Sequence, residues 1–139
     1  MEQRDYILRE IEKIGALLRA FRQRLFGGKK NEATQLDLLV DSAKEELMRE
    51  TNFDLDKFLA PDTQYTDEYI LSFAGFSAEN IELLAEFLAQ IGFSDECGNS
   101  KMYLEKALQL YNLCELKSRV YSFERENKMN AIKSVLQLK

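Results

Sequence analysis

Five acidic side chains lie close together in the sequence: Asp54, Asp56, Asp62, Asp67 and Glu68. Carboxylates bind hard cations such as Ca²⁺ and transfer protons in acid–base catalysis. A calcium loop, however, needs oxygen ligands at alternate positions, a central glycine and a terminal glutamate within about twelve residues, and this segment lacks that spacing. We therefore interpret Asp54 and Asp67 as charges in first helical turns and the other three as surface charges.

The chain has 139 residues and no histidine. The Ser-His-Asp and Cys-His catalytic arrangements and the two-histidine zinc motifs are therefore excluded. The segment GGKKN lacks the spacing of a phosphate-binding loop. The two cysteines, Cys97 in a polar loop and Cys114 on an apolar face, are not expected to form a disulfide. We predict a protein that is not an enzyme and needs neither a cofactor nor a metal.

Positive charge gathers at the start of the chain. Residues 1–30 carry eight basic and four acidic side chains, whereas residues 32–80 carry three and twelve. A basic amphipathic helix can pack within its own domain, bind a partner helix or a second copy, or lie on an anionic membrane. We favour packing within the domain and keep a protein partner or a homodimer as the main alternative. Membrane contact is not expected, because the acidic middle of the chain would be repelled, and the net charge of −5 argues against nucleic acid.

The spacing of apolar residues predicts a first helix over residues 4–26, which Gly27 and Gly28 end and could leave semi-independent of the rest. Its stripe alternates steps of three and four and comprises Ile7, Ile11, Ile14, Leu18, Phe21 and Leu25. Against a partner, the apolar residues would supply burial and the arginines attraction to an acidic surface. These candidate partner-binding residues are Ile14, Leu18, Arg19, Phe21, Arg22, Arg24 and Leu25.

The same periodicity predicts further helices up to about residue 49, over 81–91, over 101–118 and over 123–137. Asn31 or Thr34 would cap the first of these, and Ser122 the last. A short helix, starting at Thr51 or Asn52, is expected through residues 53–59, and Pro61 prevents its continuation. The following segment, DTQYT, is expected to be a turn or loop.

The pattern G-F-S-x-E occurs twice, at residues 75–79 and 92–96. In each copy we expect the glycine to adopt the left-handed conformation that ends a helix. Phe76 would then pack back on Leu71, and Ser77 would cap the next helix.

Together these elements predict a single all-α domain over residues 1–139, with about six or seven helices arranged as antiparallel hairpins. The segment YLEKALQLY, residues 103–111, resembles the second helix of a tetratricopeptide repeat, with Leu104, Ala107 and Leu108 at the packing positions. The resemblance implies tetratricopeptide-like packing of the hairpins in the C-terminal half.

The opening RDYILREIEKIGALLR, followed by LFGG, resembles the start of a group of small bacterial proteins that form a domain of unknown function and begin D-Y-I-x-R-x-I-E. The similarity extends through NFDLDKFLA and AENIELLAEFL to YLEKALQLY and YSFERENK. It implies a bacterial, cytoplasmic, all-helical protein and transfers no activity.

We therefore expect a cytoplasmic protein-interaction or adaptor module that uses the first helix or a groove between hairpins. The alternative is a sensor of a small apolar ligand or of a membrane surface, which would use the basic first helix or a pocket between hairpins. The aromatic residues expected to line that pocket are Tyr69, Phe73, Phe87 and Tyr111.

Overall fold

The computed structural model describes residues 2–27, 33–94 and 98–138, which fold into seven α-helices and no β-strand. This confirms the predicted all-α fold. The predicted helix stop at Gly28, the cap at Asn31 and the loop cysteine Cys97 lie outside the described residues. The helices are α1 (Glu2–Gly27), α2 (Ala33–Thr51), α3 (Leu55–Phe58), α4 (Thr63–Leu71), α5 (Ala78–Phe93), α6 (Ser100–Ser118) and α7 (Phe123–Leu138).

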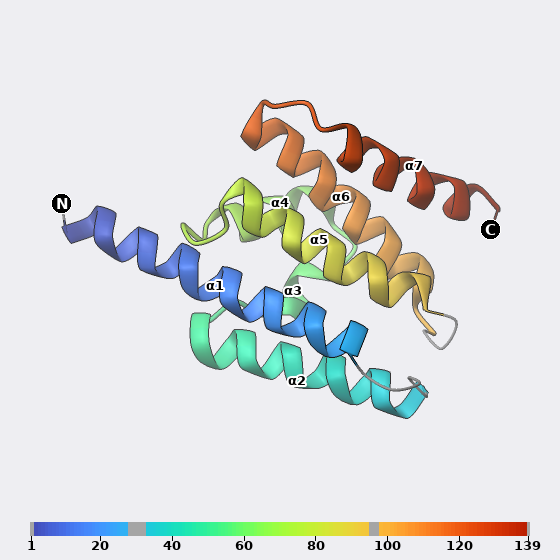
Figure 1. The fold of residues 1–139 in the computed structure, drawn as a ribbon, viewed down its shortest axis with the longest axis horizontal. Helices are drawn as coiled ribbons and strands as arrows, with labels where there is room; N and C mark the ends of the chain where they lie inside the picture. The colour runs from blue at the N-terminus through green and yellow to red at the C-terminus, as the bar shows by residue number, and fades with distance from the viewer. Residues whose placement is uncertain (1, 28–32, 95–97, 139) are drawn as a thin grey trace.

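Most of the helices form one layer (Figure 1). Helices α2, α1, α5, α6 and α7 lie side by side in that order, and α1 and α2, like α5 and α6, form antiparallel hairpins. The short helices α3 and α4 cover the far side of this layer in the view of Figure 1. The first turns of α1 extend beyond the other helices.

Helix α5 is at the centre of the packing. Its apolar residues are not confined to one stripe, and a helix that is apolar on most sides is stable only when it is buried on most sides. Helix α1 covers one side and α6 another. The buried residues of α5 are Asn80, Ile81, Leu84, Ala85, Phe87, Leu88, Ala89, Ile91 and Gly92.

Two polar caps explain the helices that follow α2. The side chain of Asp54 accepts a hydrogen bond from the amide of Asp56 at 3.0 Å and starts α3, so the predicted start at Thr51 or Asn52 is wrong. The side chain of Asp62 accepts from the amide of Tyr65 at 3.0 Å and starts α4. The prediction of a turn or loop for DTQYT is therefore also wrong, because an aspartate that satisfies a free amide of the first turn stabilises a helix there.

The two G-F-S-x-E copies have a different role from the predicted one. None of the described glycines has a positive φ, and Gly92 lies inside α5. A Cβ atom on Gly92 would lie 2.7 Å from Leu104 Cγ of α6, and one on Gly75 would lie 2.6 Å from Ile14 Cδ1 of α1. Both glycines thus allow neighbouring segments to approach closely. The predicted cap at Ser77 is confirmed, since its Oγ accepts from the amide of Asn80 at 3.2 Å.

We predict that Gly75→Ala destabilises the protein by about 1–3 kcal/mol, because the added methyl also meets the backbone of α1, at 3.1 Å from the Glu10 carbonyl oxygen. Urea unfolding of the variant measures this loss. Gly98→Ala is the matched control, since no heavy atom lies within 4 Å of its added Cβ, and its free energy of unfolding should stay within about 0.5 kcal/mol of wild type. Equal stabilities of all three proteins would contradict the close approach at Gly75.

Candidate functional site

The apolar residues expected to contact a partner on the first helix lie in the core instead. Ile14, Leu18, Phe21 and Leu25 are all buried, and Phe21 packs on Phe87 of α5 with ring centroids 5.5 Å apart. The favoured interpretation, packing within the domain, therefore holds for these four residues. They cannot form a face for a partner in this fold.

The three arginines of the same helix pair with acidic residues of other helices. Glu46 and Glu79 belong to the acidic segment of residues 32–80, whereas Glu86 lies beyond it. The hydrogen bond from Arg24 lowers the pKa of the Glu46 carboxyl below its ordinary value. The pairs and their nitrogen–oxygen distances are Arg19–Glu79 at 3.0 Å, Arg22–Glu86 at 3.0 Å and Arg24–Glu46 at 2.6 Å.

The four aromatic residues predicted to line one apolar pocket do not come together. Tyr69 and Phe73 contact each other and Phe53, on the α3–α4 side of the molecule. Phe87 faces α1 instead. Tyr111 alone lines an open groove. These residues lie on helix faces that point in different directions. The spacing of residues within one helix shows which of them share a face, but it does not show which faces of different helices meet.

That groove lies between α1 and α7, with α5 beneath it, and has a volume of about 350 Å³. We call it the α1–α7 groove. Four helices contribute to it, its interior is largely apolar, and its charged groups come from α1, α5 and α7. Its lining residues are Arg22, Glu86, Ala89, Gln90, Phe93, Tyr111, Lys128, Ala131 and Ile132.

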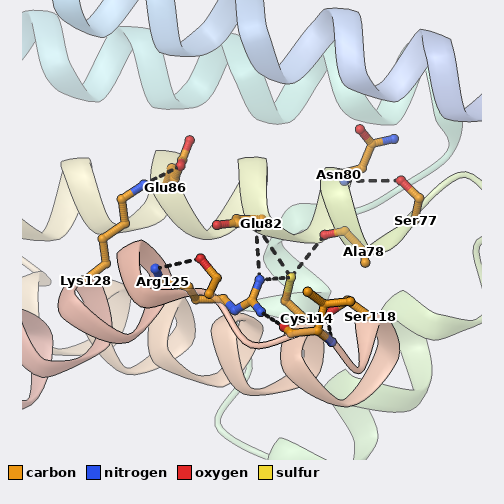
Figure 2. Close-up of polar contacts among 11 residues, drawn as sticks. Ser77, Ala78, Asn80, Glu82, Glu86, Cys114, Ser118, Arg125 and Lys128 are labelled. Carbon is orange, nitrogen blue, oxygen red and sulfur yellow. Dashed lines mark hydrogen bonds and ion pairs between the residues drawn. The ribbon is translucent and has the colours of Figure 1, made fainter.

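One carboxylate joins the two sides of the α1–α7 groove. Glu86 Oε1 accepts a hydrogen bond from Arg22 Nη1 of α1 at 3.0 Å, and its Oε2 accepts from Lys128 Nζ of α7 at 2.6 Å (Figure 2 shows the pair with Lys128). The side chains of Arg22 and Lys128 remain 41% and 42% exposed. Two cations face one anion, so the charged groups of the groove carry a net charge of +1 in a chain of net charge −5.

Two neutral polar side chains also line the groove. Gln90 Oε1 is buried, and it is one of two buried side-chain polar atoms among the described residues that have no hydrogen-bond partner. Such an atom is costly unless a donor reaches it. Burial and the nearby carboxylate of Glu86 raise the pKa of Tyr111 far above its ordinary value, so its hydroxyl keeps its proton at neutral pH.

A second set of contacts, one turn earlier on α5, fixes the start of α7 (Figure 2). Arg125 Nη1 lies 3.5 Å from both Glu82 Oε1 and Cys114 Sγ, and Arg125 Nη2 donates to the Val120 carbonyl oxygen at 2.6 Å. Cys114 is a buried free thiol that donates to the Ala78 carbonyl oxygen at 3.3 Å. Burial raises the pKa of this thiol, which disfavours the reactive thiolate. The cluster therefore has a structural role.

A larger groove of about 750 Å³, between α4 and α6, contains a buried lysine. Lys106 Nζ donates to Thr66 Oγ1 at 3.0 Å and to Gln109 Oε1 at 3.1 Å, and it lies 5.0 Å from the centroid of the Phe58 ring. Gln109 Nε2 in turn donates to Asp67 Oδ1 at 2.6 Å. These bonds join α4 to α6. They explain the burial of Lys106, so no ligand is needed to explain it.

The five carboxylates of residues 54–68 lie on α3, on α4 or at the N-cap positions of these two helices. Asp54 and Asp62 are helix caps, Asp56 pairs with Lys44 at 2.9 Å, and Asp67 lies in the middle of α4 rather than in a first turn. Within residues 2–27, 33–94 and 98–138, no three metal-binding side chains of the types His, Cys, Asp and Glu lie together. No helix of this part of the chain is both long and apolar enough to cross a membrane.

Sequence reasoning missed most of the α1–α7 groove. It singled out Arg22 and Tyr111, but not Glu86, Gln90 or Phe93. One signal was present, because Lys128, Ala131 and Ile132 follow the helical spacing that puts a charge beside an apolar face. The remaining positions meet only once α1, α5, α6 and α7 are packed.

We predict that Gln90→Leu leaves the free energy of unfolding unchanged or raises it by about 1 kcal/mol, because it removes an unpaired buried oxygen. Chemical denaturation tests this, with Gln23→Leu at an exposed position of α1 as the control. A clear loss of stability in Gln90→Leu alone would mean that this amide has a partner in the folded protein.

For the buried lysine, we predict that Lys106→Met is as stable as wild type at neutral pH or more stable by about 1 kcal/mol, because desolvating an ammonium group is costly. Burial lowers the pKa of Lys106, so between its folded pKa and its ordinary value the unfolded chain binds more protons than the folded one. The stability of wild type relative to the variant should therefore rise as the pH approaches about 10.

Urea unfolding of both proteins at several pH values measures this difference, and Lys101→Met, at an exposed position, is the control. Comparison with the variant cancels the titration of Tyr111 and Cys114, which both proteins share. A difference that does not change with pH would contradict the lowered pKa of Lys106.

Comparison of the chain with protein-family models, with curated proteins and with solved structures found no match. The resemblances to the bacterial group and to tetratricopeptide repeats therefore stay predictions, and the function has to be argued from the α1–α7 groove itself.

Proposed function

We propose that this protein is a non-enzymatic interaction module that binds an apolar side chain of a partner protein in the α1–α7 groove. The observation that carries the proposal is the groove itself, an open apolar concavity with charged residues on both sides. The expected partner face on the first helix is buried, so the proposal uses the other expected surface, a groove between helices.

The dimensions and lining of the α1–α7 groove support binding. Its volume of about 350 Å³ lies within the range of roughly 300–1,000 Å³ that is usual for ligand-binding clefts. Phe93, at one end, is 45% exposed, and large aromatic side chains of this kind often contribute strongly to protein–protein affinity. Helix-in-groove recognition uses such an arrangement, with a few apolar anchors inside and charges around them.

The groups in the groove support binding better than catalysis. The described lining residues include no cysteine or serine nucleophile, and Tyr111 keeps its proton at neutral pH. The remaining candidates, Glu86 and Lys128, are paired with each other at 2.6 Å. A small apolar molecule is the second candidate occupant, because the same volume would hold one.

We predict that Ala131→Trp abolishes partner binding, because an indole at this exposed lining position would fill the groove without disturbing the core. Asn130→Trp places the same ring on the next exposed residue of α7, outside the groove, and should bind as wild type does. Affinity capture from cells that make the protein, with the three baits in parallel, measures this.

The proposal requires proteins that wild type and Asn130→Trp retain and that Ala131→Trp loses. Identical sets of captured proteins on all three baits would exclude the α1–α7 groove as the binding site. Thermal unfolding by circular dichroism shows whether each bait is folded.

A further inference from the structure

Resting on the proposed function, we infer that the partner segment is an acidic amphipathic helix, with a carboxylate one or two turns from its apolar anchor. The carboxylate lies beside Arg22 and Lys128, and the anchor lies farther along the groove, over Ala89 and beside Phe93. The inference depends on how charge and apolar surface are distributed in the groove.

Arg22 and Lys128 have N–H donors that Glu86 does not use. Each of its two oxygens accepts one hydrogen bond, from Arg22 and from Lys128 respectively. A guanidinium has five N–H donors and an ammonium three, so both cations retain N–H groups beyond this shared carboxylate. Because both side chains are about two-fifths exposed, a second carboxylate can reach these groups from solvent.

The sign of the charge in the groove favours an acidic partner. The net charge of +1 in the α1–α7 groove contrasts with the net charge of −5 of the whole chain. An incoming carboxylate would complete two pairs of opposite charge, whereas an incoming lysine or arginine would add a third cation. Complementary charge at the edge of an interface mainly favours the correct partner and speeds its association.

The dipole of α5 determines which end of the groove favours the carboxylate of the partner segment. Helix α5 ends at Phe93, and the carbonyl oxygens of a helix C-terminus carry partial negative charge. A carboxylate is therefore disfavoured at the Phe93 end and favoured near Glu86, seven residues earlier. At 1.5 Å per residue, these positions are about 10 Å apart along the helix axis, which is about two turns of a bound helix.

The test uses three fluorescein-labelled helical peptides of about 15 residues that share two leucine anchors one turn apart and differ only in two flanking residues, which are Glu, Gln or Lys. Fluorescence anisotropy gives the dissociation constants. We expect the Glu peptide to bind about tenfold more tightly than the Lys peptide, with the Gln peptide between them. Added salt should reduce this preference.

Protein variants assign the preference to residues. Arg22→Gln and Lys128→Gln should each weaken binding of the Glu peptide by about two- to fivefold and leave the Gln peptide nearly unaffected. Glu86→Gln should tighten binding of the Glu peptide. Arg24→Gln is the matched control, since Arg24 lies on the same helix but pairs with Glu46 outside the groove.

The outcomes separate the inference from the proposed function. If wild type binds all three peptides equally and Ala131→Trp binds none of them, the inference is overturned, but the proposed function as an interaction module is not. No binding of any peptide at millimolar concentration would overturn both. If decanoate binds the groove and none of the three peptides does, the occupant is a small apolar acid, and the inference is overturned.

Discussion

The burial of α5 on most of its sides is the constraint on which the rest of the structure depends. Nine of its sixteen residues are buried, and they do not form a single stripe. Its neighbours must therefore approach closely, which explains why a glycine, with no Cβ, stands at position 92 beside Leu104 of α6. Helices α1 and α6 cover the α5 surface well, but α7 contacts mainly α6. The α1–α7 groove is the part of α5 that its neighbours cover incompletely.

The sequence predicted the long helices because their apolar residues recur with the helical period over many turns. The nine-residue α4 was expected to begin later, with Asp67 in its first turn, because it buries only Thr66 and Ile70, too few residues to show a period, although Asp62 was a readable cap. The glycines were misread for another reason. A helix end and a close contact both require the absence of a Cβ, so Gly75 and Gly92 fit either account until the neighbouring segments are known.

The candidate site was harder to predict than the fold. An apolar stripe such as Ile14, Leu18 and Phe21 has the same chemistry whether it packs inside one chain or between two, because both kinds of helix contact use the same packing of side chains. A groove, in contrast, is defined by what the helices fail to cover. Arg22 and Tyr111 were singled out as members of two different expected sites, and the other lining residues are related only by the arrangement of four helices.

Electrostatics link the fold to the proposed site through Glu86. Exposed ion pairs contribute only about 0–1 kcal/mol each, so the pairs of α1 cannot be what holds the helices together. They can, however, determine which charges remain for a partner. Without Glu86, Arg22 and Lys128 would face each other across the groove and repel. With it, the two cations are held near each other by hydrogen bonds of 3.0 and 2.6 Å, and one positive charge remains uncompensated. The carboxylate that joins the two sides of the groove therefore compensates only one of the two cations, and the remaining positive charge is what attracts a second carboxylate.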